Sequence, residues 1–442
     1  MQTTIQSWRK LGFGLFIHVG LYSILGGVHQ DRKVIRGYSE QILSHGYLPQ
    51  WDYERLVDRF TFERFDPDHI VAVAKRAGMR YLVITAKHHD GFCLFDTKST
   101  AYNSINTPYG KDAVRELSEA CRRGGLEFGV YFSWIDWNFP HALPISPHNC
   151  DAIPPAHQRL NIAQLTELLS GYGPIRELWM DMGAPTAEQS AEVYALVKSL
   201  QPGCAVNGRI WNDYQDFLTM GDNQIPTLPL NCPWQTPASI YKETWGYRSW
   251  QERGDLEDKV TELTETLRSV RAAGGTYLLN IGLKGDGSIV PFEEEVLLGI
   301  GKRLREKPLE AEDPRLPSAD LPLGTPTFGS VHYRYGGTDY YTYKPIPTTL
   351  AWKVALEEHG TYSLVWEHEP PLEEAVKVQI RLDELLWHAT LQAGQRSGIL
   401  AEELHLQSGT HQLEVSTVGE PMKRTELTCP DLMMTIKKEH KE

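Results

Sequence analysis

Titratable side chains follow a short apolar run in the segment 80–92 of this 442-residue chain. The run is rich in β-forming residues and ends at His88, His89 and Asp90. Packing explains its apolar half, whereas the polar half stands where α/β sheets and β/α barrels place their sites, at the carboxyl end of a strand. The segment therefore indicates either displayed chemistry or a loop whose histidines only cap the strand.

The same pattern recurs at other predicted strands. The polar residues concerned are His18 after 13–17, Asp136 between Trp134 and Trp137 after 131–133, Asp181 after 177–180, and Arg209 after 205–207. Parallel strands carry their carboxyl ends to one edge, so these side chains would gather on a single rim. We interpret the set as a functional site, because capping explains each of them alone but not all of them together.

A small polyhydroxylated ring is the substrate that this combination suits best. The chain has neither a P-loop nor the glycine pattern of a dinucleotide site, and adjacent histidines are not spaced as zinc ligands are, so we predict no cofactor and no metal. Trp can stack on the C–H face of a sugar, while His, Arg and carboxylates bond its hydroxyls. An Asp in such a pocket can attack an anomeric carbon, with a second carboxyl as acid/base.

A repeated local pattern predicts the elements that position these residues. Helical stretches ending in basic residues and glycine precede β-rich runs at 71–84, 117–132 and 267–280. Basic residues suit the last turn of a helix, and glycine supplies its left-handed cap. Repeated helix-to-strand units predict an α/β fold with a parallel sheet, of about the length of a β/α (TIM-like) barrel. Helices are expected at 68–77, 111–123, 187–200 and 255–273.

The composition changes near residue 307. Residues 308–326 are rich in proline and acidic side chains and are predicted to form a linker. Alternating patterns at 330–335, 362–366 and 411–415 predict half-buried strands of a C-terminal β-sandwich over 327–442. The barrel domain would then span 1–307.

Charge and hydropathy exclude some partners. The net charge of −13 argues against nucleic acid, and no apolar run approaches the roughly 18 residues of a membrane span. The first residues lack signal-peptide features, so we expect a cytoplasmic protein, or a periplasmic or extracellular one if a signal peptide was removed. The six cysteines are scattered and are predicted to be free thiols. The oligomeric state is left open.

Several motifs resemble those of the retaining α-L-fucosidases among the glycoside hydrolases. In this sequence they stand at 13–18, 86–92, 96–100, 131–137, 177–181, 245–247 and 274–282, in the order of that family. The resemblance covers roughly residues 8 to 306. It implies a β/α barrel followed by a β-sandwich, and a fucosylated oligosaccharide or glycoconjugate as substrate.

The resemblance also implies roles for individual residues. Asp181 resembles the nucleophile, and Glu40 resembles the glutamate that binds the sugar. The residues that resemble hydroxyl ligands or pocket walls are His18, His88, His89, Tyr131, Trp179, Arg209 and Trp234.

The acid/base is where this sequence departs from the family. Gln235 occupies one of the two places where family members carry the acid/base glutamate, and an amide can neither donate a proton as an acid nor accept one as a base. Asp222 and Glu243 are the remaining candidates. Two hypotheses follow: a retaining exo-glycosidase of terminal α-L-fucosyl or similar L-galactosyl residues, or a fucose-binding relative impaired in catalysis by Gln235. Val19 and Gln41, which replace larger aromatic residues of the family, could alter the pocket.

Overall fold

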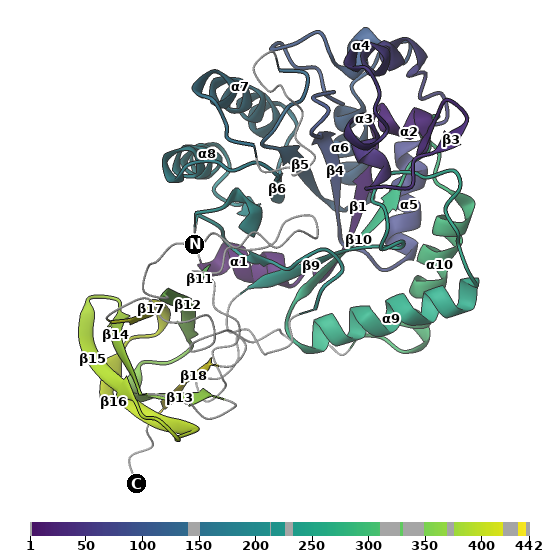
Figure 1. Ribbon diagram of the computed structural model, residues 1–442. Coiled ribbons are helices and arrows are strands. Elements are labelled where there is room, and N and C mark those ends of the chain that lie inside the picture. The colour runs from purple at the N-terminus through teal and green to yellow at the C-terminus, as the bar shows by residue number, and fades with distance from the viewer. Residues whose placement is uncertain are drawn as a thin grey trace. The chain divides into compact units, whose positions relative to one another are not determined.

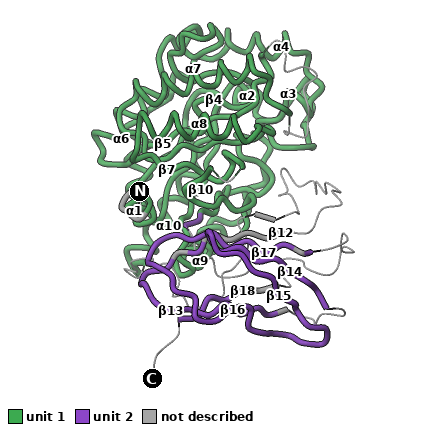
Figure 2. The backbone as a smooth tube through the Cα atoms, turned by 90° about the vertical axis from the view of Figure 1, so that its left-hand side faces the viewer, with its two compact units in different colours: residues 1–224, 235–312 green, residues 225–234, 313–442 purple. Residues whose placement is uncertain are grey.

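Parallel strands and the helices between them form the larger part of the computed structural model (Figure 1). The structure describes residues 2–139, 151–212, 214–225, 233–309, 328–329, 349–368, 375–418 and 432–438. The chain divides into one unit of residues 1–224 and 235–312 and a second unit of residues 225–234 and 313–442 (Figure 2).

The first unit is built on an eight-stranded sheet in the order β7-β6-β5-β4-β1-β10-β9-β8. Its strands are β1 (Phe13–His18), β4 (Tyr81–Lys87), β5 (Glu127–Ser133), β6 (Glu177–Asp181), β7 (Ala205–Val206), β8 (Leu218–Thr219), β9 (Trp234–Ser239) and β10 (Thr276–Gly282). Every ladder from β7 to β9 is parallel, as the repeated helix-to-strand units predict. The sheet is curled: just before β8, the N–H of Asp216 donates to the carbonyl oxygen of Val206 in β7 at 2.8 Å.

Six helices accompany this sheet (Figure 1): α5 (Pro67–Arg76), α6 (Ala113–Gly124), α7 (Pro155–Gly171), α8 (Ala187–Leu200), α9 (Leu256–Ala272) and α10 (Pro291–Glu306). Local sequence sets their ends. At α6 the Asp112 side chain accepts from the N–H of Arg115, and Gly125 closes the helix at φ 72°. The four helices expected from the sequence are confirmed within a few residues.

Short elements fill the start of the chain and the connection between β1 and α5. They are α1 (Gln2–Arg9), α2 (Tyr22–Leu25), β2 (Val28–His29), β3 (Arg32–Lys33), η1 (Ser39–Gln41), α3 (Ile42–His45), α4 (Gln50–Glu54) and η2 (Arg55–Arg59). Because this connection leaves the carboxyl end of β1, it begins at the edge where the predicted site residues stand. Two further short helices are η3 (Ser104–Asn106) and η4 (Gly208–Ile210).

Aromatic side chains fill the inner face of the sheet. A buried cluster contains Phe16, Tyr81, Val83, Tyr131, Trp179, Trp245 and Leu278. Residues two apart on a strand share a face, so Glu177 and Asp181 lie on the same inner face of β6 as Trp179. Glu177 begins the strand and Asp181 ends it. The interior therefore has three layers: a lower polar layer at the amino ends of the strands, an aromatic middle layer, and an upper polar layer at their carboxyl ends.

The second unit consists of two antiparallel sheets. Their strands are β11 (Phe328–Gly329), β12 (Thr349–Leu356), β13 (Gly360–His368), β14 (Val376–Leu382), β15 (Leu385–Leu391), β16 (Ser397–Leu406), β17 (Gly409–Thr417) and β18 (Leu432–Lys438), in the orders β11-β12-β17-β14-β15 and β16-β13-β18. Val378 and Val415 of the first sheet share one buried core with Leu364 and Ile436 of the second. The predicted strand at 330–335 and residues 310–326 of the predicted linker lie outside the described residues.

Membrane and cysteine predictions can be compared with the described part of the chain. No helix in that part is both long and apolar enough to cross a membrane. Cys93, Cys121 and Cys204 are buried free thiols, and the other three cysteines lie outside the described residues.

A glycine contact between α5 and α10 gives a test of the packing. A Cβ on Gly301 would lie 2.0 Å from the carbonyl oxygen of Arg76, a backbone atom that no rotamer change can move. We expect Gly301→Ala to lower the free energy of unfolding by about 1–3 kcal/mol, measured as a fall in melting temperature. Gly171→Ala is the control, because nothing lies within 4 Å of its Cβ position. Equal melting temperatures for the two variants would contradict this packing.

Candidate active site

Asp181 is the centre of the candidate site at the end of β6. Its side chain is buried, and each of its two carboxylate oxygens accepts a hydrogen bond. The Tyr131 hydroxyl on neighbouring β5 donates to Oδ2 at 2.9 Å, and Nη1 of Arg209 donates to Oδ1 at 3.0 Å. These donors compensate the buried charge and fix the direction of the carboxylate. A carboxylate held in this way can act as an oriented nucleophile.

Arg209 joins Asp181 to a second carboxylate. It lies on η4, directly after edge strand β7, and its Nη2 donates to Oδ1 of Asp222. The indole Nε1 of Trp245 donates to the other oxygen of Asp222 at 3.2 Å. On the side of the sheet interior, the guanidinium carbon of Arg209 lies 4.9 Å from the ring centre of Trp179. One guanidinium therefore separates two carboxyl groups, an arrangement that suits nucleophile and acid/base.

His18 presents a hydrogen-bond acceptor. Its Nδ1 lies 2.7 Å from Oδ1 of Asn280, whose Nδ2 donates to the carbonyl of Trp245. Since Oδ1 can only accept, Nδ1 of His18 carries the proton. Burial lowers the pKa of His18 to about 3, so the ring is neutral at working pH. Its Nε2 is then left with a lone pair that can accept from a sugar hydroxyl.

His88 presents the complementary donor. Its Nδ1 accepts from the backbone N–H of His89 at 2.9 Å, and its ring stacks on Tyr131 with centres 4.9 Å apart. Burial, together with the neighbouring His89 and His18, holds its pKa well below the ordinary value. The proton of this neutral ring therefore sits on Nε2. With ring centres 5.5 Å apart, His18 and His88 offer one acceptor and one donor to adjacent hydroxyls.

His89 lies beside His88 after the end of β4. It is completely buried, and its ring stacks on Trp137 with centres 3.8 Å apart. Neither ring nitrogen has a hydrogen-bond partner among the described residues. Buried polar atoms are rarely left unsatisfied, so a small hydroxylated ligand or water at this rim would complete its bonding.

Glu40 reaches the rim from the connection between β1 and α5. Its Oε2 accepts from the N–H of Gly246 at 2.8 Å and from that of Trp245 at 3.4 Å. Burial raises the pKa of Glu40 to about 7, although these two donors act in the opposite direction. The rim thus gathers Glu40 with the histidines and Asp181.

The two acid/base candidates occupy different environments. Asp222 contacts Arg209 and Trp245, as described above. Glu243 is exposed at the surface, where its carboxylate lies 3.5 Å from Nε2 of Gln251. The geometry therefore favours Asp222 over Glu243.

Gln235 lies in the lower polar layer, and the structure does not support its interpretation as a substituted acid/base. Its Nε2 donates to Glu177 Oε1 and to the Tyr81 hydroxyl, both at 3.0 Å, and its Oε1 accepts from Trp179 Nε1 at 2.7 Å. Glu177 begins β6, whereas Asp181 ends it, roughly 13 Å further along the strand. Gln235 therefore faces the wrong layer for proton transfer at Asp181.

Trp234 is also placed differently from expectation. It begins β9 and is buried, whereas Asp181, the three histidines and Arg209 stand at carboxyl ends of strands or directly beyond them. Its predicted contact with the sugar therefore gains no support from its position on the strand.

Sequence reasoning missed the roles of Trp245 and Asn280. Both lie in motifs that carried the family resemblance, at 245–247 and 274–282, but their partners are distant in the sequence. The contacts to Asp222, Glu40 and His18 arise only from folding. A buried Asn on a largely apolar strand was the one local signal.

Within the described ranges, no three His, Cys, Asp or Glu side chains are grouped so that they could hold a metal ion.

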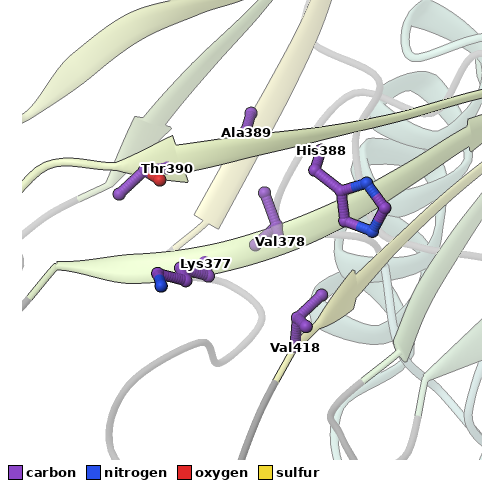
Figure 3. Close-up of a pocket in the computed structure, with 6 residues that line it drawn as sticks. All are labelled: Lys377, Val378, His388, Ala389, Thr390 and Val418. Atoms are coloured by element: carbon purple, nitrogen blue, oxygen red, sulfur yellow. The ribbon is translucent and has the colours of Figure 1, made fainter.

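A separate small hollow of about 150 Å³ lies in the second unit (Figure 3). It is lined by Lys377, Val378, His388, Ala389, Thr390 and Val418. No carboxylate lines it, so it lacks the groups that glycosidic chemistry requires. The rim at Asp181 remains the candidate active site.

Comparison with known families identifies relatives of the first unit. A family profile described as alpha-L-fucosidase matches residues 1–307. The solved structure of the alpha-L-fucosidase AlfC from Lactobacillus casei is 32% identical, with a TM-score of 0.62, and the match covers 68% of this chain and 98% of that one.

Curated relatives give the same picture. An alpha-L-fucosidase of Branchiostoma floridae is 29% identical over 69% of this chain and 71% of its own length. The tissue alpha-L-fucosidase of Bos taurus is 30% identical over 66% of this chain and 65% of its own length. The chain thus spans about two thirds of the length of these relatives.

A more distant structure covers both units. An alpha-L-fucosidase from Bacteroides thetaiotaomicron is 21% identical, with a TM-score of 0.62, over 98% of this chain and 95% of that one. At this identity the match shows a shared fold.

The position of Gln235 gives a test of the layer assignment. In Gln235→Glu the new carboxyl would be buried beside Glu177, whose own pKa burial already raises to about 7. Its pKa would be raised in the folded state only, so its stabilising effect is lost as pH rises. We expect a lower free energy of unfolding than for Gln235→Met, with a deficit that grows from pH 5 to pH 8 to roughly 3 kcal/mol, measured by denaturant unfolding at each pH. A pH-independent difference would place residue 235 in contact with solvent and contradict the assignment.

Proposed function

Because this chain belongs to the α-L-fucosidase family of glycoside hydrolases, we propose that it removes terminal α-L-fucosyl residues from glycans by a retaining mechanism. The observation that carries the proposal is the pair of carboxyl groups, Asp181 and Asp222, held on one guanidinium at the rim of the sheet. We also infer that the curled sheet closes as a β/α barrel, with the bond between Asp216 and Val206 joining its two edges.

Ligands of a related enzyme support the substrate class. AlfC has been solved with α-L-fucose as product, and variants of it with Fuca(1,6)GlcNAc and with 4-nitrophenyl-α-L-fucopyranoside. A fucosylated oligosaccharide or glycoconjugate is therefore the proposed substrate here.

In the first step the nucleophile and the acid act on opposite sides of the glycosidic bond. An oxygen of Asp181 attacks the anomeric carbon, and the bond from that carbon to the leaving oxygen breaks. The carboxylic acid of Asp222 transfers its proton to the leaving oxygen, which departs as an alcohol. The products are a fucosyl ester of Asp181 and the carboxylate of Asp222.

In the second step water replaces the alcohol. The carboxylate of Asp222 takes a proton from a water molecule, whose oxygen attacks the anomeric carbon. The ester bond breaks, Asp181 regains its charge and Asp222 regains its proton. Two inversions leave α-L-fucose, so the configuration is retained.

The histidines and Glu40 bind the ring rather than transfer its protons. His18 accepts from one hydroxyl and His88 donates to another, as their tautomers require. The aromatic rings of Phe16, Trp179 and Trp245 near the carboxylates favour the C5 methyl group of fucose over the hydroxymethyl group of L-galactose, whose hydroxyl would need a buried partner. Impaired catalysis was suggested by Gln235, and with Gln235 in the lower layer no observation favours that alternative.

Removal of the nucleophile is the first test. Asp181→Gly should lower kcat for an aryl α-L-fucoside by roughly three orders of magnitude or more, because no covalent intermediate can form. Sodium azide should restore turnover by attacking the substrate directly, and the product should be β-L-fucosyl azide. Turnover that survives in Asp181→Gly without azide would show that another residue is the nucleophile.

Removal of the acid/base is the second test. Asp222→Ala should lower kcat/KM for an α-1,6-linked fucosyl-GlcNAc by about 10²–10⁴-fold, and much less for a 2,4-dinitrophenyl fucoside, whose leaving group needs no proton. Azide should speed breakdown of the fucosyl-enzyme and give α-L-fucosyl azide. Glu243→Ala is the matched control and should show neither effect. The reverse result would assign the acid/base role to Glu243.

A further inference from the structure

Trp245 joins the acid/base to the sugar-binding half of the site. We infer that it is a positioning residue for Asp222, acting through its indole N–H and separately from any contact of its ring with the sugar. The inference rests on the proposed function, in which Asp222 is the acid/base.

Asp222 needs anchoring because it stands on a turn. Its side chain is 24% exposed, and the next residue, Asn223, has φ 58°. Two bonds of Asn223 hold the turn against β9: its N–H donates to Pro237 O at 2.9 Å, and its Oδ1 accepts from Ser239 N at 2.8 Å. These bonds place the backbone, whereas the direction of the Asp222 carboxyl depends on its own partners.

Those partners are divided between its two oxygens. Arg209 donates to Oδ1, and Trp245 Nε1 donates to Oδ2 at 3.2 Å. Arg209 also binds Asp181, so its position serves both carboxyls at once. The indole donor is instead directed at Asp222, and it can be removed without disturbing the bond between Arg209 and the nucleophile.

Trp245 is itself rigidly held. Its backbone N–H donates to Glu40, and its backbone carbonyl accepts from Asn280 at 2.7 Å. The centre of its ring lies 5.3 Å from that of His18. Only 7% of its surface is exposed. A donor fixed in this way can hold Oδ2 in one direction through both steps of the reaction, which is the condition for efficient proton transfer.

Further groups face Asp222 besides Trp245. Arg209 lies on η4, His18 on β1 and Tyr38 in the turn before η1. Burial keeps the two rings uncharged, lowering the pKa of His18 and raising the pKa of Tyr38. The indole and the guanidinium each donate to one oxygen of Asp222, so loss of the indole donor removes the bond that fixes the direction of Oδ2.

Trp245→Phe tests the inference because it removes the N–H and keeps an aromatic ring. We expect kcat/KM for an α-1,6-linked fucosyl-GlcNAc to fall roughly 10-fold, with about 2-fold or less change for the 2,4-dinitrophenyl fucoside. Trp250→Phe is the matched control. Trp250 lies on the same connection between β9 and α9, and its indole donates to the Gly27 carbonyl at 2.9 Å, so the ratio of the two substrates should not change.

A double variant separates this inference from the proposed function. In the Asp222→Ala background, Trp245→Phe should have no further effect on the ratio of the two substrates, because its partner is gone. Equal losses on both substrates would overturn the inference and leave a packing role for the ring. If Asp222→Ala alone shows no dependence on the leaving group, the proposed function itself fails.

Discussion

The guanidinium of Arg209 connects the two carboxyl groups on which the proposed chemistry depends. Asp181 and Asp222 would repel each other if both were charged and buried, and Arg209 lies between them as their shared partner. Its own position depends on the aromatic middle layer, because it lies over the ring of Trp179. Trp179 is in turn held by Gln235 in the lower polar layer. The orientation of Asp181 and Asp222, the proposed catalytic carboxyls, thus depends on hydrogen bonds well below the rim.

This dependence explains why strand ends were predictable and the layers beneath them were not. The polar residues after 13–17, 81–87 and 177–180 are visible in the sequence because they interrupt apolar runs, and the structure places them at one edge. Gln235 stands at the start of a strand, and its motif does not say which end of the sheet it faces. A side chain's depth in the interior follows from strand register, which a single sequence specifies only weakly.

The helix-to-strand units and the C-terminal strands were predictable for a similar local reason. Helix caps such as Asp112 and Gly125 bond to groups only a few residues away in the chain. The alternating burial along β14 follows directly from the alternation of apolar and polar residues in its sequence. Trp245 is the opposite case, since its partners Glu40 and Asn280 are 205 and 35 residues away. Contacts of this kind depend on the folded chain, so a motif can identify the residue without revealing its role.

The pH behaviour of the rim also follows from burial. The neutral rings of His18 and His88 give one acceptor and one donor whose roles do not change across ordinary working pH. Burial brings the pKa of Glu40 to about 7, which lies within that range. Glu40 accepts from the backbone N–H of Trp245, whose indole donates to Asp222. Protonation of Glu40 is therefore connected to Asp222, the proposed acid/base, through one tryptophan.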